Sequence, residues 1–245
     1  MIGAVLIIAL VLLFALFFVP GAGTPRVRLA DPGPGPGTEG GPADHLAMGV
    51  EITTENVQAV IATLQRAATY TREIRQTHYW NDGQSSGERT AEIWVTPRAL
   101  RVDWDDNESM VITADTYHLW FEGGPIITRP VTEGLGESLA QILDQFQGIP
   151  SYETVLALDT DQIISAGYTE RVLDGELRPV IYVAAPTGAL GYVDFFYICL
   201  TTGLLIEVTT FDGEIPIYRL ETLRLTIGPP DAEAFLLPDG TNPLD

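Results

Sequence analysis

The sequence contains no lysine: all 13 basic residues are arginines, and 33 acidic residues outnumber them, for a net charge of −20. A surface this acidic repels phosphate backbones, which excludes nucleic acid as an expected partner. It also disfavours peripheral binding to anionic lipid head groups, so any membrane contact must come from an apolar segment. The simplest role of the acidity is a soluble, repulsive surface.

Cysteine is nearly absent as well. Cys199 is the only one, which rules out an internal disulfide and a cysteine-based zinc cluster. It lies in the apolar run of residues 195–200, where a small buried hydrophobe is expected. Cys199 is far from the N-terminal hydrophobic run and no cysteine lies directly after that run, so we expect no lipidation there.

Motifs of catalysis and metal binding are also missing. The three histidines, His45, His78 and His118, show no ligand spacing, and there is no G-x-S-x-G nucleophile motif. Residues 103–108 (DWDDNE) resemble a calcium loop but lack its glycine and its distal glutamate, so we expect a solvated turn. The sequence therefore predicts no metal site and no cofactor, and it gives little support to an enzyme.

An apolar segment opens the chain. Residues 2–19 are almost uninterrupted Val, Ile, Leu, Phe and Ala, just long enough to span the ~30 Å hydrocarbon core of a bilayer. This length exceeds the ~7–15 apolar residues of most signal peptides and predicts a single-pass membrane anchor over residues 1–20. A cleaved signal peptide stays an alternative, because Gly21-Ala22-Gly23 offers a small-x-small cleavage site, and the domain would then be secreted.

The orientation of this anchor is ambiguous from charge. Arg26 and Arg28 follow the apolar segment and no basic residue precedes it, which by the positive-inside rule would place the domain in the cytoplasm. Two arginines are a weak bias.

Residues 21–52 form a Pro/Gly-rich linker, since the stretch DPGPGPGTEGG at 31–41 has no helical or strand periodicity.

Residues 53–240 form the expected folded domain. A helix begins near Thr53 or Thr54, which can cap it, and its apolar face carries Val57, Val60 and Ile61. Further helices are predicted at residues 136–146 and 152–158. Strand periodicity predicts eleven strands, at residues 70–80, 89–96, 99–104, 110–114, 117–121, 126–128, 167–173, 180–184, 191–200, 204–211 and 216–226.

The turns between these strands are short, and several carry Asp-Gly or Asn-Asp-Gly, which favours antiparallel hairpins. A sheet of so many strands must curl or close. The fold class is therefore mainly β (α+β): a curved antiparallel sheet forming an incomplete β-barrel, with helices covering its concave face. The C-terminal run of residues 231–238 is expected to dock on an edge of the sheet.

Aromatic and apolar side chains are the candidate binding residues. Core packing explains most strand aromatics, but a curved sheet with helices on one side leaves room for an apolar cavity. The candidates for its lining are Trp94, Trp104, Trp120, Phe121, Phe195 and Tyr197 from strands, and Leu139, Ile142, Leu143 and Phe146 from the helix predicted at 136–146.

The segment order and several local motifs resemble the LolA/LolB-like superfamily of bacterial envelope domains, which includes RseB-type regulatory domains. Residues 93–97 (IWVTP) are similar to the family's L-W-V-x-x-P strand end, residues 108–115 (ESMVITAD) to its E-S-I-L-V-S-D hairpin, and residues 119–121 (LWF) to its L-W-F-Y strand. The resemblance covers about residues 53–238.

This resemblance implies an extracytoplasmic half-barrel whose apolar cavity suits an acyl chain or a lipidated protein. One departure matters: lipoprotein carriers of the family have an arginine just before the strand-end proline, where this chain has Thr96, with Arg98 and Arg101 beyond it. Carriers are also freely soluble, whereas this chain is predicted to be tethered, so lipoprotein shuttling is not expected.

Three functions stay open at this point. The first is a membrane-tethered binding module for a lipid, acyl or lipoprotein-like ligand. The second is a protein-interaction or regulatory module that contacts an envelope partner, such as a sensor or a cell-wall enzyme, without a ligand. The third, an enzyme, has the least support.

Overall fold

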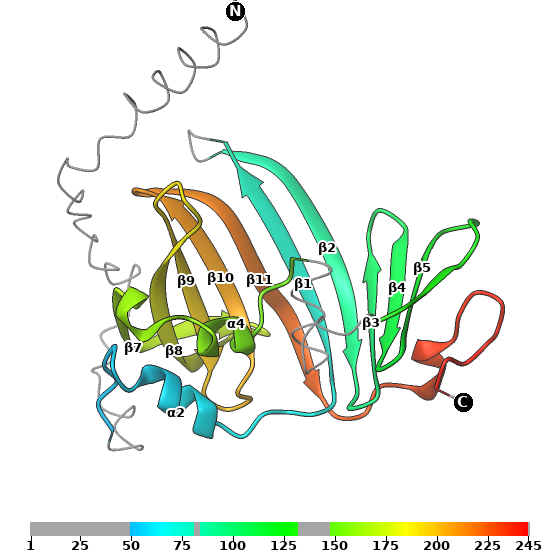
Figure 1. The fold of residues 1–245 in the computed structure, drawn as a ribbon, viewed down its shortest axis with the longest axis horizontal. Coiled ribbons are helices and arrows are strands. Elements are labelled where there is room, and N and C mark those ends of the chain that lie inside the picture. The colour runs from blue at the N-terminus through cyan, green and yellow to red at the C-terminus, as the bar shows by residue number, and fades with distance from the viewer. Residues whose placement is uncertain (1–49, 81–83, 132–147, 245) are drawn as a thin grey trace, which may run out of the picture. The chain divides into compact units, whose positions relative to one another are not determined.

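Eleven antiparallel strands form one sheet in this computed structural model, which describes residues 50–80, 84–131 and 148–244 (Figure 1). The strands are β1 (Tyr70–Tyr79), β2 (Ser85–Val95), β3 (Ala99–Trp104), β4 (Glu108–Thr113), β5 (Thr116–Phe121), β6 (Ile127–Pro130), β7 (Ser165–Leu173), β8 (Glu176–Thr187), β9 (Tyr192–Cys199), β10 (Leu205–Asp212) and β11 (Ile215–Ile227). Each corresponds to a strand predicted from sequence periodicity. The mainly-β fold class is confirmed.

The sheet is open. Its order is β6-β5-β4-β3-β2-β1-β11-β10-β9-β8-β7, so two consecutive meanders are joined where the first strand pairs with the last. The β1–β11 pairing runs from Tyr70 opposite Ile227 to His78 opposite Tyr218. Because β6 and β7 form two free edges, the barrel is incomplete.

The sheet is twisted rather than flat. The Leu225 backbone N–H on β11 donates a hydrogen bond of 3.2 Å to Asp174 Oδ1 in the β7–β8 turn, although three strands separate β7 from β11 in the sheet order. Such an approach requires the strong twist that antiparallel strands adopt.

Two short helices cover one end of one face, which we call the inner face. Helix α2 (Val57–Thr63) and helix α4 (Tyr152–Leu156) contribute to a buried cluster with side chains of β8, β9 and β10. The members of this cluster are Ile52, Val57, Ile61, Val155, Ile163, Ile181, Val183, Phe196, Ile198, Leu205 and Val208. The opposite side of the sheet is called the outer face.

The helix predictions need adjustment. Helix α2 begins at Val57 with Asn56 as N-cap rather than at Thr53 or Thr54; the Asn56 side chain instead accepts a hydrogen bond of 2.8 Å from the Thr53 backbone. Helix α4 lies where the helix at 152–158 was expected, ends earlier, and has a capping box at Ser151. The helix predicted at 136–146 lies outside the described residues.

The C-terminal segment docks on the outer face and not on an edge, which corrects the sequence-based expectation. Phe235, in the 3₁₀-helix η3 (Ala232–Phe235), and Leu237 are buried in one cluster with Ala99, Val111 and Trp120. Trp120 and Val111 lie on β5 and β4, whose outer face offers an apolar surface that the free edge of β6 lacks. Burial of apolar area therefore decides the docking position.

All described residues belong to one compact unit, residues 38–245. Four buried clusters lie within it, and their members fall between Ile52 and Leu244. Such a unit has its own core and is expected to fold as an independent domain. Within the described residues no helix has the length and apolarity needed to cross a bilayer; residues 2–19 lie outside that part of the chain.

Candidate binding surfaces of the sheet

The inner face continues as an apolar surface over β1–β5, beyond the helices. Alternate positions of these strands point to this face, because residues paired across the ladder share a face and side chains alternate along each strand. The buried members are Ile74, Ala91, Ile93, Leu100, Val102, Trp104, Met110, Ile112, Ile149 and Leu220. Val131 and Ile149, on either side of residues 132–147, both pack against this surface.

This apolar surface extends to solvent at the β5–β6 edge. Leu119 packs against the buried cluster and lies opposite Ile127 on β6. Phe121, two residues further along β5, shares the face of Leu119 and is a diagonal neighbour of Ile127. Phe121 and Ile127 are 51% and 41% exposed. Large apolar side chains at this exposure, continuous with a core, form a candidate contact surface for an apolar ligand or partner.

One arginine is buried on the inner face. Arg72 lies on β1, two residues before Ile74, and its Nη1 donates a hydrogen bond of 3.1 Å to the Leu205 carbonyl on β10. Burial lowers the pKa of Arg72, with the nearby Tyr70 as an opposing influence. Its guanidinium therefore spans β11 and ties the two halves of the sheet together.

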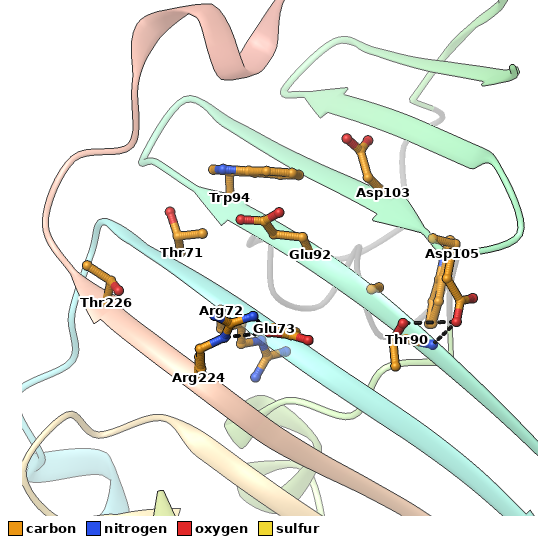
Figure 2. Close-up of a pocket in the computed structure, with 12 residues that line it drawn as sticks. Thr71, Arg72, Glu73, Thr90, Glu92, Trp94, Asp103, Asp105, Arg224 and Thr226 are labelled. Atoms are coloured by element: carbon orange, nitrogen blue, oxygen red, sulfur yellow. Dashed lines mark hydrogen bonds and ion pairs between the residues drawn. The ribbon is translucent and has the colours of Figure 1, made fainter. Parts of the chain in front are cut away.

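A groove of about 460 Å³ lies on the outer face of β11, β1, β2 and β3 (Figure 2). The cross-strand pairs Thr71–Trp94, Glu73–Glu92 and Glu92–Asp103 set its floor. Trp94 projects over the groove from β2 in Figure 2. The outer-face residues of its lining are Thr71, Glu73, Thr90, Glu92, Trp94, Asp103, Asp105, Arg224 and Thr226; Arg72, Ala91 and Trp104, at inner-face positions of the same strands, also border it.

Most carboxylates of this groove already have partners. Glu73 pairs with Arg224 on β11, with Arg224 Nε 2.6 Å from Glu73 Oε2. Asp103 pairs with Arg101 at 2.8 Å, and Asp105 accepts two hydrogen bonds of 2.9 Å from Thr90. Such a polar lining suits a hydrated polar group and not an acyl chain. Among the described residues no three His, Cys, Asp or Glu side chains could hold a metal ion together.

An alternating row of charges crosses the outer face beside the groove. Glu207 contacts Arg171 and Arg219, each at 3.3 Å, and Glu221 contacts Arg219 at 3.1 Å and Arg75 at 2.7 Å. The hydrogen bond with Glu221 raises the pKa of Arg75. These pairs link β7, β10, β11 and β1, so we assign them a structural role.

The aromatic residues predicted to bind are divided between the two faces. Trp104 is buried in the inner cluster, with Arg89 Cζ 3.9 Å from its ring centroid, and Phe121 lies at the exposed inner edge. Trp94 lies in the outer groove, and Trp120 is buried beneath the C-terminal segment.

The remaining candidates lie elsewhere. Phe195 and Tyr197 belong to an outer-face cluster on β9, and Arg171 Cζ lies 3.7 Å from the ring centroid of Tyr197. Leu139, Ile142, Leu143 and Phe146 are outside the described residues. The structure therefore brings only Trp104 and Phe121, of the described candidates, to the apolar inner surface.

Ile127 was missed as a surface residue. The sequence carried only part of the signal: Leu119 and Phe121 have the two-residue spacing of one strand face, but the position of Ile127 opposite Leu119 depends on the register of the β5–β6 turn. The singled-out histidine His118, by contrast, lies on the outer face, where its ring nitrogens contact the Thr116 and Thr128 hydroxyls at 3.1 and 2.9 Å. Burial lowers the pKa of His118, with Asp239 opposing the shift.

Arg101 makes contacts that differ from those expected of the arginine that lipoprotein carriers have before the strand-end proline. Its Nη1 donates hydrogen bonds of 2.7 and 3.3 Å to the Ala234 and Leu236 carbonyls of the C-terminal segment. It lies 5.4 Å from the ring centroids of both Trp94 and Trp120. Arg101 therefore fixes the C-terminal segment on the outer face rather than holding helices on the inner one. Thr96, at the family arginine position, closes the β2–β3 turn by accepting a hydrogen bond of 3.0 Å from the Ala99 backbone.

No family model and no curated protein matches this sequence. Solved structures similar to the chain include an uncharacterised conserved protein from Thermus thermophilus, with TM-score 0.43, 8% identity, and coverage of 71% of this chain and 88% of that one. An outer membrane lipoprotein-sorting protein domain from Vibrio parahaemolyticus matches with TM-score 0.30 and 10% identity, covering 74% of this chain and 95% of that one.

A third similar structure is a DUF1329 family protein from Desulfovibrio piger, with TM-score 0.35, 9% identity, and coverage of 76% and 96%. At these identities and TM-scores the likeness concerns strand arrangement and not function.

Proposed function

We propose that the domain is a binding module that holds the apolar chain of a lipid or lipidated partner against the inner face of β2–β6. The observation that carries this proposal is the exposure of two large apolar side chains, Phe121 and Ile127, at the edge of the buried cluster around Trp104 and Met110. An acyl chain laid on this surface would gain about 0.8 kcal/mol per methylene group removed from water.

The proposal includes the cellular setting. Residues 2–19 tether the domain to a membrane, and the domain acts on the extracytoplasmic side, which the LolA/LolB-like resemblance supports. The acidic surface supports a tether over peripheral adsorption, because the net charge of −20 opposes contact with anionic lipid. Residues Leu139, Ile142, Leu143 and Phe146 stay proposed contributors to the same surface on their sequence pattern alone.

The test uses residues 38–245, purified without detergent and titrated with dodecanol under native mass spectrometry. We expect a one-to-one complex whose yield falls in Phe121→Ser and Ile127→Ser. Both side chains are about half exposed, at 51% and 41%, so the substitutions should leave the fold intact.

Val172→Ser is the matched control, because Val172 is also an exposed apolar residue, 63% exposed, but lies on β7 at the other edge of the sheet. Equal loss of dodecanol binding in all three variants, or no binding by the unaltered domain, would contradict the proposal.

A protein-interaction module without a ligand is the second candidate, and the edge strand β6 favours it. All four residues of β6 are exposed, so its outer backbone groups are open to pairing with a strand of a partner. The short strand, with Arg129 and Pro130, weakens this reading because both residue types discourage edge pairing. Absence of any bound amphiphile together with partner contacts mapped to β6 would favour it.

A further inference from the structure

Two neighbouring rows of side chains form the groove on the outer face (Figure 2). The first row crosses the adjacent strands β11, β1, β2 and β3 and consists of Arg224, Glu73, Glu92 and Asp103. The second row lies two residues further along β11, β1 and β2 and consists of Thr226, Thr71 and Trp94. Neighbours within a row have Cβ atoms about 5 Å apart, and the rows are about 7 Å apart. One small ligand in the groove can therefore reach both rows.

Glu92 is the carboxylate without a partner at the centre of the first row. Its two cross-strand neighbours are both neutralised: Glu73 accepts from Arg224 Nε at 2.6 Å, and Asp103 accepts from Arg101 Nε at 2.8 Å. Glu92 is exposed, and within the described part of the chain no hydrogen bond or ion pair holds its carboxylate. Like charges directly opposite one another destabilise a sheet. The position of Glu92 is therefore explained better by a ligand than by folding.

Trp94 supplies an aromatic surface beside Glu92. It is half-buried, because it packs against the cluster beneath the C-terminal segment, and it also borders the groove. Thr71 and Thr226 follow it in the second row, and neither hydroxyl has a hydrogen-bond partner among the described residues. A hydroxyl both donates and accepts hydrogen bonds. The groove thus combines an aromatic ring with available donors and acceptors.

The excess of acceptors selects the class of ligand. Four carboxylates line the groove, those of Glu73, Glu92, Asp103 and Asp105. Each ionised carboxylate only accepts and has about four lone-pair sites, so acceptor capacity is left beside the protein partners. A sugar ring carries many hydroxyl donors, and its C–H bonds are attracted to the negative face of an aromatic ring. A volume of about 460 Å³ lies within the usual range of small-ligand sites.

Charged ligands fit this groove less well than neutral ones. An anionic ligand would meet the four carboxylates as like charges. A cationic ligand would approach Arg224 in the lining and Arg101, whose Cζ lies 5.4 Å from the ring centroid of Trp94. These two guanidinium groups already neutralise two of the carboxylates. The lining therefore favours a neutral, hydroxyl-rich ligand.

We infer that the outer groove binds a neutral carbohydrate. One sugar ring lies against Trp94, and its hydroxyls donate hydrogen bonds to Glu92 and exchange hydrogen bonds with Thr71 and Thr226. This site is on the face opposite the surface proposed for an apolar chain. The inference goes beyond the proposed function and does not depend on it.

The test uses residues 38–245 and three neutral disaccharides as probes: maltose, cellobiose and N,N′-diacetylchitobiose. Saturation-transfer NMR detects binding and reports which sugar protons contact the protein, and a titration gives the affinity. We expect at least one disaccharide to bind, with the strongest transfer to the C–H protons of one ring. Absence of binding by all three would overturn the inference.

Glu92→Gln then assigns binding to the groove. The amide keeps the shape of the side chain but removes the charge, so the affinity for the bound disaccharide should fall about fivefold or more, because hydrogen bonds to charged groups are the stronger ones. Glu122→Gln is the matched control, since Glu122 is also an exposed glutamate but lies outside the groove. It should leave the affinity unchanged.

The remaining outcomes concern the class of ligand and the proposed function. Spermidine serves as a cationic probe: if it binds more tightly than every disaccharide and Glu92→Gln abolishes that binding, the groove is a cation site and the inference is wrong. The inference is also wrong if Glu92→Gln and Glu122→Gln bind the disaccharide alike. Dodecanol binding should be unchanged in Glu92→Gln, so failure of this inference leaves the proposed function standing, and the reverse also holds.

Discussion

Replacement of Phe235 by alanine tests whether the C-terminal segment is part of the folded core. Phe235 is 2% exposed in a cluster with Val111 and Trp120 on the outer face. Truncation of a buried phenylalanine costs about 3–5 kcal/mol, from lost burial and from the cavity left behind. The segment is near the chain end and can partly detach, so we expect the lower part of that range.

Urea unfolding of residues 38–245, followed by tryptophan fluorescence, measures this loss. With a urea dependence of about 2–3 kcal/mol per molar, the midpoint of Phe235→Ala should fall by about 1–2 M. Leu236→Ala is the control, because the neighbouring Leu236 is 36% exposed, and it should cost less than about 1 kcal/mol. Equal losses in the two variants would refute the docking of Phe235 in the outer cluster.

Three further predictions concern stability. Asp194→Asn should stabilise the domain at neutral pH: burial raises the folded-state pKa of Asp194 above its ordinary value of 3.8, so the carboxyl favours folding below that value and the benefit is lost as pH rises through the folded pKa. When thermal unfolding is repeated at progressively more acidic pH, this gain in stability should disappear. A gain that does not change with pH would contradict the upward direction of the Asp194 pKa shift. Gly203→Ala should destabilise the domain more than Gly213→Ala does in chemical denaturation. Both glycines have a positive φ, 67° and 61°, so both variants share a conformational cost of about 1–2 kcal/mol. Only at Gly203 would the added Cβ also lie 2.9 Å from a backbone oxygen, that of Gln65. Glu207→Gln should cost about 1–2 kcal/mol, because it weakens contacts to Arg171 and Arg219 that are partly screened by solvent, whereas the exposed Glu214→Gln should be neutral.

Strand positions were accessible from the sequence because each strand carries a local signal. Alternation at residues 99–104 and 117–121 and turn residues such as Asp174-Gly175 need no knowledge of distant contacts. The structure places Asp174 and Gly175 in the turn between β7 and β8, both at positive φ. Because the turns are short, strands that follow one another in the sequence were expected to pair, and this pairing gives the two meanders.

Long-range pairing was not accessible in the same way. The β1–β11 ladder joins residues that are far apart in the sequence, such as Tyr70 and Ile227. Its register depends on which apolar side chains of the two strands lie on the same face of the sheet. The same ladder brings the two meanders into one sheet, so that His78 on β1 lies opposite Tyr218 on β11. Docking of the C-terminal segment likewise required knowing that Ala99, Val111 and Trp120 form one apolar surface.

Photolabelling with a dodecyl diazirine tests the central claim most directly, because it reports where an apolar chain lies. Residues 38–245 would be labelled in solution, digested and mapped by mass spectrometry. We expect labels on β5 and β6 around Phe121 and Ile127, suppressed by excess dodecanol. Labels confined to the exposed Val172 and Leu177 at the β7 edge, or labels that excess dodecanol does not reduce, would contradict binding on the inner face of β2–β6.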